Sequence, residues 1–416
     1  MLVRSIEIRV SMAYMNIKSN ASVDEYQFSS IPRRSWDFGL LFIFFLCLFI
    51  DLGGSLYLRY ISLVVLLLIL IWTLISKPQT FLSYISSPVI IFLFLVWPLV
   101  AALNGVLRQA DSGLIFQNIL ALLSFPFLVV FFSNFETNTI VRSFTSAATI
   151  LAAFVLIFWL MLYTDNAMAQ SLAEYLSERE AGYFGVRELD GVSFPVVYFK
   201  ATLFFVPAAI FLIFRASPFA ALLLVAALMA ATSKTGVVIA GLIILINLAR
   251  RQPFFLLFLT ALGLVAIFFS FLGGEIKEIL YALFEDANTL DVRVGHWDSL
   301  LTLFAENNLD FFVGQGAGTL FYSSGVDDLV NNIELDHLNS LRKFGVVWFI
   351  PFLIFVFSTV YVCYMKNRVL LAIALAVSFV ICGTNPVLLT LLFFSILAFS
   401  YVELMRVYVA SKNRSC

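Results

Sequence analysis

The sequence predicts an all-α, polytopic integral membrane protein with about twelve transmembrane helices and two long outer loops containing short helices. Of the 416 residues, 62% are hydrophobic and only 12% are charged, about half of the roughly 25% typical of soluble domains. Apolar runs recur along the chain, and most have about the length that a helix needs to cross a bilayer. The net charge of −1 says nothing about partners, but the sequence shows no large basic cluster, which argues against nucleic acid as a partner.

The predicted spans form a single transmembrane domain from residue 36 to residue 407. Residues 1–35 form a polar tail without the apolar run of a cleavable signal peptide, and 408–416 form a second tail. The expected helices cover 36–56, 60–76, 88–106, 113–132, 142–163, 196–214, 218–231, 235–248, 254–272, 346–364, 370–382 and 386–407.

Lysine and arginine set the expected orientation, because cytoplasmic loops of membrane proteins are enriched in both. Basic residues gather in the segments that would face the cytoplasm if both termini lie there, for example Arg250 and Arg251. This orientation places the two long polar loops, 164–195 and 273–345, on the outer side of the membrane.

The first outer loop contributes two candidate substrate contacts. Residues 168–180 fit a short amphipathic helix at the interface. Arg187 follows between glycines, where backbone can approach a ligand closely. Lys200 falls about one turn into an apolar span, where a charge is costly and is usually functional or paired.

The second outer loop holds both histidines of the chain, His296 and His337, and a series of closely spaced glycines: Gly314, Gly316 and Gly318. The glycine series lacks the lysine and the following hydroxyl of a nucleotide phosphate loop. The four cysteines form no CxxC pair and none lies in an outer loop. We therefore expect no disulfide framework and no cysteine metal site. No set of His, Cys, Asp and Glu residues has the spacing of metal ligands, so we expect neither a metal nor a cofactor.

The order of residues in the second outer loop is more specific than any one motif. Arg293-x-x-x-Trp297 precedes Asn308, a Phe-x-Gly-x-Gly-x-Gly series, and Gly345 at the start of a membrane helix. This order resembles the second large periplasmic loop of the O-antigen ligase and polymerase superfamily of integral membrane glycosyltransferases. The turn from Ser233 to Gly236 is similar to a turn of that family. Glu334 stands where the ligases carry a His-Asn pair, which resembles the polymerases of O-antigen and exopolysaccharide repeats.

The resemblance implies a metal-independent polymerase in the bacterial inner membrane. Such enzymes transfer undecaprenyl-pyrophosphate-linked glycan to a sugar hydroxyl of another lipid-linked repeat unit, on the periplasmic side. The implied partners are the lipid-linked donor and acceptor, the bilayer and, as a further candidate, a chain-length regulator. The implied polysaccharide is O-antigen of lipopolysaccharide, capsule or exopolysaccharide.

Residue chemistry then suggests roles within this reaction. Arginine forks bind phosphates in a bidentate manner, so Arg293 is the first candidate for the pyrophosphate, with Arg187, Lys200 and Arg342 assisting. Arg342 also fits an anchor at the membrane interface. The acceptor hydroxyl needs a general base, and the candidates are Glu334, His337 and Asp336, although His337 also fits a helix cap. Trp297 and the three glycines are expected to shape the loop.

Two other functions remain open at this point, and so does a purely structural membrane protein, which would not need the series from Arg293 to Gly345. A ligase would transfer finished glycan to the lipid A core instead of to another repeat unit. A lipid-linked sugar flippase would belong to a different class, and should carry charges deep in several spans of symmetric halves. The few intramembrane charges, such as Asp51 and Lys200, lie near span ends, which favours chemistry at one membrane surface.

Overall fold

The computed structural model describes residues 36–189, 192–214, 217–233, 236–241, 287–383 and 385–414. These residues all belong to one compact unit, Arg33–Cys416. The span expected at 254–272 and most of that at 235–248 lie outside the described residues. So do residues 275–286, whose apolar spacing also predicts an interfacial helix.

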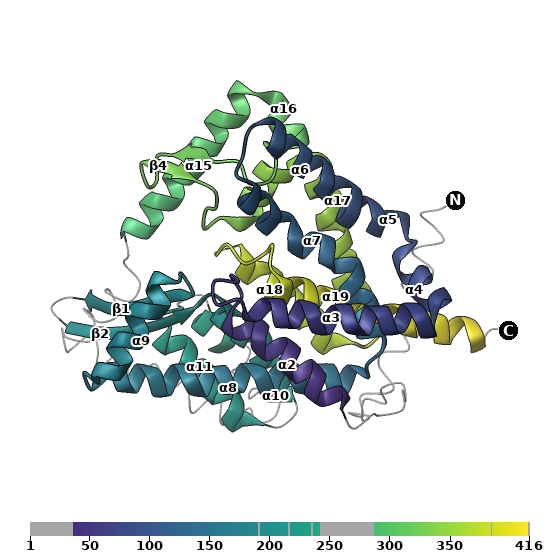
Figure 1. Ribbon diagram of the computed structural model, residues 1–416, viewed down its shortest axis with the longest axis horizontal. Helices are drawn as coiled ribbons and strands as arrows, with labels where there is room; N and C mark the ends of the chain where they lie inside the picture. Colours follow the sequence, from purple (N-terminus) through teal and green to yellow (C-terminus); the bar gives the residue numbers. More distant parts are fainter. Residues whose placement is uncertain are drawn as a thin grey trace, which may run out of the picture. The chain divides into compact units, whose positions relative to one another are not determined.

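The described chain is mainly helical (Figure 1). Its α-helices are α2 (Asp37–Ile50), α3 (Leu58–Ser76), α4 (Pro78–Ile85), α5 (Pro88–Ile91), α6 (Trp97–Leu107), α7 (Ser112–Ser133), α8 (Thr137–Tyr163), α9 (Ala167–Glu178), α10 (Phe205–Phe214), α11 (Pro218–Ala230), α15 (Ala287–Glu306), α16 (Asn308–Val313), α17 (Asp336–Met365), α18 (Val369–Cys382) and α19 (Leu391–Arg414). A π-helical turn, η1 (Phe92–Val96), joins α5 to α6, and a 3-10 helix, η2 (Lys200–Phe204), precedes α10.

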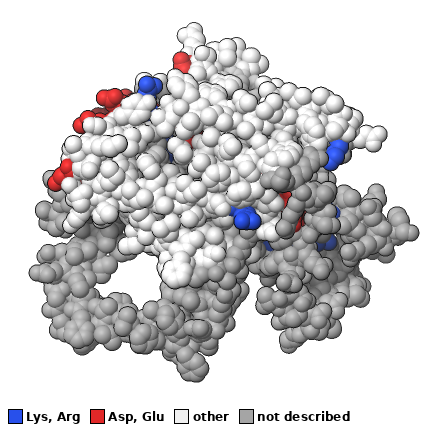
Figure 2. Space-filling view, turned by 60° about the horizontal axis from the view of Figure 1, so that its bottom comes forward, with Lys and Arg blue, Asp and Glu red and all other residues white. Residues whose placement is uncertain are grey.

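Five of the helical segments in the described chain are long and apolar enough to cross a membrane: Leu58–Ser76, Pro88–Leu107, Ser112–Ser133, Thr137–Tyr163 and Asp336–Met365. Shorter apolar helices lie at Asp37–Ile50, Lys200–Ile213, Phe219–Ala230 and Val369–Cys382. The count of about twelve spans stays a prediction. On the face drawn in Figure 2, most of the described surface carries no charged side chain, as a surface in contact with lipid requires.

Phenylalanine rings fill much of the space between the helices. Phe44 and Phe45 of α2 are buried and contact Phe131 and Phe132 of α7 and Phe144 of α8. The outward faces are apolar as well, as in α3, where Leu68 is 61% and Ile75 78% exposed. Interior and exterior are therefore both apolar, which leaves the helix ends as the places where polar groups gather.

Two antiparallel hairpins correct the all-α prediction. Strand β1 (Gly182–Leu189) pairs with β2 (Val192–Phe199), and β3 (Phe321–Ser323) pairs with β4 (Asp328–Val330). The predicted span 196–214 is consequently wrong in its first part, and α10 begins only at Phe205. Residues 192–199 are rich in β-branched and aromatic side chains that favour a strand. Gly182 admits the pairing, because a Cβ there would lie 2.0 Å from the carbonyl oxygen of Tyr198.

Other boundaries follow the sequence pattern more closely. The amphipathic helix expected at 168–180 is α9, which Asn166 caps through its side chain. The span expected from residue 346 starts earlier, because α17 begins at Asp336 and is interrupted at Gly345, where φ is 72°. The first turns of α17 therefore carry polar residues inward before the apolar part of the helix begins.

Candidate functional site

The glycine series is a close-packed loop between α6 and α17. Gly314, Gly316 and Gly318 have φ values of 89°, 101° and 77°, a region that side chains other than glycine rarely adopt. A Cβ on Gly316 would lie 2.5 Å from the amide nitrogen of Gly105, and one on Gly314 would lie 2.5 Å from the carbonyl oxygen of Lys343. Glycine is needed here because backbone packs directly on backbone.

The backbone amides of this loop donate hydrogen bonds to the neighbouring helices α17 and α6. Gln315 N–H donates to the carbonyl of Arg342 (2.7 Å), and Ala317 N–H donates to that of Ala101 (2.9 Å). The side chain of Asn104 donates to the carbonyl of Gly314 (2.7 Å). These bonds fix α17 against α6, beside α16 (Figure 1), and make the loop a support for the polar residues of α17.

Arg342 lies within this support. It is 0% exposed, and its guanidinium lies 4.4 Å from the centre of the Phe321 ring. Its side chain donates to Gln315 Oε1 (2.8 Å), the carbonyl of Thr319 (3.1 Å), the carbonyl of Asn331 (2.6 Å) and Asn339 Oδ1 (3.1 Å). The structure thus places Arg342 in the protein interior, where protein acceptors bind its guanidinium.

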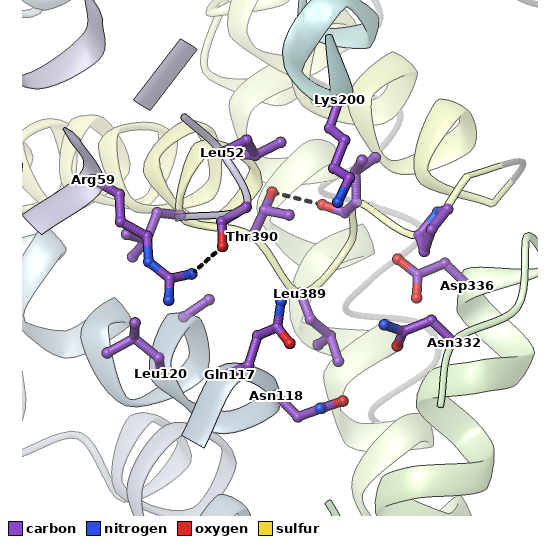
Figure 3. A pocket seen from close by; sticks show the side chains of 15 residues that line it. Leu52, Arg59, Gln117, Asn118, Leu120, Lys200, Asn332, Asp336, Leu389 and Thr390 are labelled. Atoms are coloured by element: carbon purple, nitrogen blue, oxygen red, sulfur yellow. Dashed lines mark hydrogen bonds between the residues drawn. The ribbon is translucent and has the colours of Figure 1, made fainter. Parts of the chain in front are cut away.

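A cavity of about 130 Å³ opens at one end of the helices. Its polar lining comes from segments far apart in the chain: Arg59 of α3, Gln117 and Asn118 of α7, Lys200 of η2, Asn332, and Asp336 of α17. Residues 386–391, which lead into α19, complete the wall. Figure 3 shows Arg59 and Asp336 on opposite sides of this cavity, with Lys200 between them at its upper edge.

Two cations face the cavity without a carboxylate partner. Arg59 Nη1 donates to the carbonyl of Gly53 (2.8 Å), and a Cβ built on Gly53 would lie 3.6 Å from Lys200 Nζ. Neither cation forms an ion pair with any described carboxylate. Asp51, the nearby acid, instead caps α3 by accepting from the amide of Leu58 (2.8 Å). The cavity therefore presents two cations that form no ion pair within the described chain.

Asp336 is the carboxylate of the cavity. The residue is 2% exposed, and its Oδ2 accepts from the amide of Leu388 (2.5 Å) while its Oδ1 accepts from Asn339 Nδ2 (3.4 Å). As the first residue of α17, it also lies where the helix dipole stabilises an anion. The acid is thus held in place without forming an ion pair within the described chain.

Lys343 lies behind the cavity wall. The residue is 0% exposed, and its Nζ donates to Oδ1 of Asn118 and Oδ1 of Asn332. Both asparagines line the cavity. A third cation is therefore connected to the cavity through two amide side chains.

Arg293 and Glu334 pair with each other. Arg293 Nε and Nη2 each lie 3.0 Å from Glu334 Oε2, and the two side chains are 36% and 42% exposed. One turn along α15, Trp297 is 46% exposed. Burial raises the pKa of Tyr198, and the charge of Glu334 raises it further. Two predicted functional residues thus neutralise one another at a half-exposed position.

The packing of α15 explains how this pair forms. A Cβ on Gly295 would lie 2.4 Å from the amide nitrogen of Gly325, so the helix lies directly on the loop between β3 and β4. His296 is buried and forms a hydrogen bond between its Nδ1 and Ser323 Oγ. Burial lowers the pKa of His296, which favours the neutral ring and a structural role.

His337 faces a different element. Its ring stacks on Phe379 of α18 at a centroid distance of 4.3 Å, and a Cβ on Gly383 would lie 3.0 Å from its Cδ2. It is not among the residues that line the cavity. Arg187 lies on β1, opposite Phe194, and its side chain is outside the described part of the chain.

The structure therefore divides the predicted residues among several places. Lys200 and Asp336 share the cavity, Arg293 and Glu334 form an ion pair, and Arg342 supports the glycine loop. Sequence reasoning missed the other polar residues of the cavity and its wall: Arg59, Gln117, Asn118, Asn332 and Lys343. Two signals were present. Gln117 and Asn118 interrupt an apolar span, and Arg59 stands in the first turn of a helix, where the dipole disfavours a cation.

These features define a class: a helical protein with apolar, membrane-length helices and a cationic cavity at one end of them. Comparisons of the chain with models of protein families, with curated proteins and with solved structures gave no match.

Proposed function

We propose that the protein is an integral membrane polysaccharide polymerase that transfers lipid-pyrophosphate-linked glycan to a sugar hydroxyl. The observation that carries the proposal is the cavity, in which Arg59 and Lys200 lack carboxylate partners and Asp336 lies across from them. Such a site offers binding for a phosphate leaving group and a base for an attacking hydroxyl. The resemblance of the second outer loop to glycosyltransferases of this type supports the same reaction.

The cations would hold the leaving group. Arg59 and Lys200 are placed to donate to the oxygens of a pyrophosphate at the end of membrane-length helices, where a lipid tail could extend along the apolar helix surfaces. Negative charge grows on the pyrophosphate as the glycosidic bond breaks, so these contacts strengthen in the transition state. This assigns to Lys200 the role expected from the sequence and adds Arg59.

Asp336 is the favoured base. The oxygen of the acceptor hydroxyl attacks the anomeric carbon of the donor sugar, its proton passes to the carboxylate, and the bond to the lipid pyrophosphate breaks. Of the three candidates, Asp336 alone lines the cavity within the described chain. Glu334 is paired with Arg293, and His337 packs on Phe379; we propose that both act in support of the site.

The sidedness of the site agrees with this proposal. Arg59, Lys200 and Asp336 lie in or beside three segments that the basic-residue pattern places on the same, outer side of the membrane. In the proposed topology both termini lie in the cytoplasm and the cavity faces the periplasm, where lipid-linked repeat units are polymerised. Cavity and polar groups at a helix end favour chemistry at one surface over transport through the helices.

A reconstitution experiment tests the proposal. The full chain in liposomes receives undecaprenyl-pyrophosphate-linked repeat units in excess EDTA, and products are resolved as a ladder of repeat lengths. We expect a ladder, its loss in the Arg59→Gln, Lys200→Met double variant, and normal products from Arg179→Gln, a control at an exposed arginine outside the cavity. Absence of any ladder, with transfer to added lipid A core instead, would establish a ligase. Turnover that requires a divalent ion would contradict the proposed charge neutralisation.

A further inference from the structure

We infer that Lys343 is a positioning residue that acts through Asn332, turning the amide nitrogen of that asparagine into the cavity. The inference deepens the proposed function, because it identifies how the anion site obtains a neutral hydrogen-bond donor beside its two cations. It rests on the contacts of one buried ammonium group and two amide side chains.

The first step is the direction of the amides. An ammonium group is a donor only, so each asparagine that contacts Lys343 Nζ must present its oxygen to it. The contacts are with Asn118 Oδ1 and Asn332 Oδ1. Asn339 Nδ2 also donates to Asn332 Oδ1 (3.2 Å). Two donors therefore hold the oxygen of Asn332 from behind, and the bond from the charged donor is the stronger kind.

These contacts leave the amide nitrogen of Asn332 on the side of the cavity. Asn332 Nδ2 donates to no residue in the described part of the chain, the side chain is exposed and it lines the cavity. Figure 3 shows its nitrogen directed to the interior of the cavity. Asn118 differs, because its Nδ2 already donates to the carbonyl of Leu114 (2.5 Å). Asn118 braces Lys343, and Asn332 transmits its effect.

The hydrogen-bond donors of the cavity indicate which kind of ligand it can bind. Donors on Arg59, Lys200 and Asn332 line a cavity of about 130 Å³, and the described lining also holds acceptors on Asp336, Gln117 and Thr390. A group with several oxygens and spread negative charge, such as a diphosphate ester, can accept from all three. If Lys343 were absent, the amide of Asn332 could rotate and present its oxygen to this anion, which would repel it.

The test measures binding of inorganic pyrophosphate to the full chain in nanodiscs by titration calorimetry. We expect Asn332→Ala and Lys343→Met each to weaken binding about tenfold, as loss of one hydrogen bond to a charged group implies. Because Lys343 acts through Asn332, the double variant should also bind only about tenfold more weakly, as coupled residues do. Lys366→Met removes an exposed cation remote from the cavity and should bind as the unaltered protein does.

Further outcomes decide against the inference. A loss of about 100-fold in the double variant, the product of two independent effects, would mean that Lys343 acts as a separate charge. Asn332→Asp keeps an acceptor for Lys343 but removes the amide donor, so normal binding in this variant would overturn the inference even if Lys343→Met fails to fold. In the ladder assay, Lys343→Met should raise the KM for lipid-linked donor and also lower kcat, because the amide donor of Asn332 faces the pyrophosphate on which negative charge grows in the transition state. Failure of the unaltered protein to bind pyrophosphate would remove both this inference and the proposed donor site, whereas normal binding with unaffected variants would remove the inference alone.

Discussion

The two ends of the helix bundle treat buried charge in opposite ways. At one end, Glu403 of α19 is 1% exposed, pairs with Arg368 (2.8 Å) and Arg406 (3.6 Å) and accepts from the hydroxyl of Thr137. Arg406 also donates to three backbone carbonyls, those of Phe132, Ser133 and Phe135. This network pairs both arginines with one carboxylate and ties α7, α8 and α19 together.

At the other end, the charged side chains of the cavity form no ion pair within the described chain. Leu391 at the start of α19 lines the cavity, and Glu403 lies twelve residues further on, about 18 Å along the helix at 1.5 Å per residue. Arg59 and Lys200 have no carboxylate partner among the described residues. Buried charge alone therefore does not mark a functional site; hydrogen-bonding capacity that the protein leaves unused is the more informative feature.

The largest expected effect is on turnover, after a substitution of the cavity carboxylate. Asp336→Asn keeps the shape of the side chain and an acceptor for the amide of Leu388, but removes the base. We expect turnover to fall about 10²- to 10⁴-fold, with donor binding nearly intact because a base contributes little to ground-state affinity. Ladder formation and donor titration measure the two quantities separately. A ladder of normal rate would transfer the role of base to Glu334 or His337.

The next largest effect is expected on the free energy of unfolding, after a change in the network around Glu403. Glu403→Ala leaves Arg368 and Arg406 partly buried without their carboxylate, and loss of one partner of a buried ion pair costs about 3–5 kcal/mol. The free energy of unfolding in mixed micelles should fall by this amount, while turnover per folded molecule at low temperature stays unchanged. Equal stability, or a loss of turnover without a loss of stability, would break the contrast between the two ends.

A smaller effect, on donor binding, is expected when either cation of the cavity is replaced. Lys200→Met and Arg59→Gln should each weaken donor binding about 10- to 100-fold, the range of a hydrogen bond between charged partners. Neither should lower the free energy of unfolding by more than about 0.5 kcal/mol, because neither cation is part of an ion pair in the described structure. Titration of lipid-linked donor and an unfolding curve check both statements. A stability loss like that of Glu403→Ala would show that these cations are structural.

Sequence reasoning recovered one kind of information well. Apolar periodicity located α3, α7, α8 and α11 to within a few residues, because lipid contact and helix packing both require apolar side chains. It failed at residues 192–199, where the strand partner that decides the conformation lies at 182–189. Strand preference depends on such neighbours more than helix preference does.

The site was recovered only in part, for a related reason. Lys200 was recognised because a charge in an apolar span is conspicuous, and Asp336 because it lies in the segment that resembles the glycosyltransferases. Asn332 and Gln117 are neutral, and their role depends on the groups across the cavity. The sequence predicted that a membrane helix starts after Gly345, but not that a polar helical segment precedes this glycine. Arg342 and Lys343 are adjacent in the chain, yet one holds the glycine loop and the other holds two cavity asparagines.

The last comparison lies between the open cavity and the half-exposed pair of Arg293 and Glu334. If the pair only fixes α15 against the start of α17, it does not matter which of the two residues carries the positive charge. The exchange variant Arg293→Glu, Glu334→Arg should then restore the stability and turnover that each single variant loses. We expect each single variant to lose about 0.2–1 kcal/mol of stability, the range for exposed ion pairs, and at most about fivefold in turnover, the equivalent of 1 kcal/mol. If Arg293 instead contacts the pyrophosphate, as its place in the sequence pattern suggests, exchange cannot help. Turnover would then stay about 100-fold low in the exchange variant, as after removal of one oxyanion donor, while its stability recovers. Measuring both quantities on the same three variants therefore decides whether Arg293 belongs with the paired charges around Glu403 or with the open cations of the cavity.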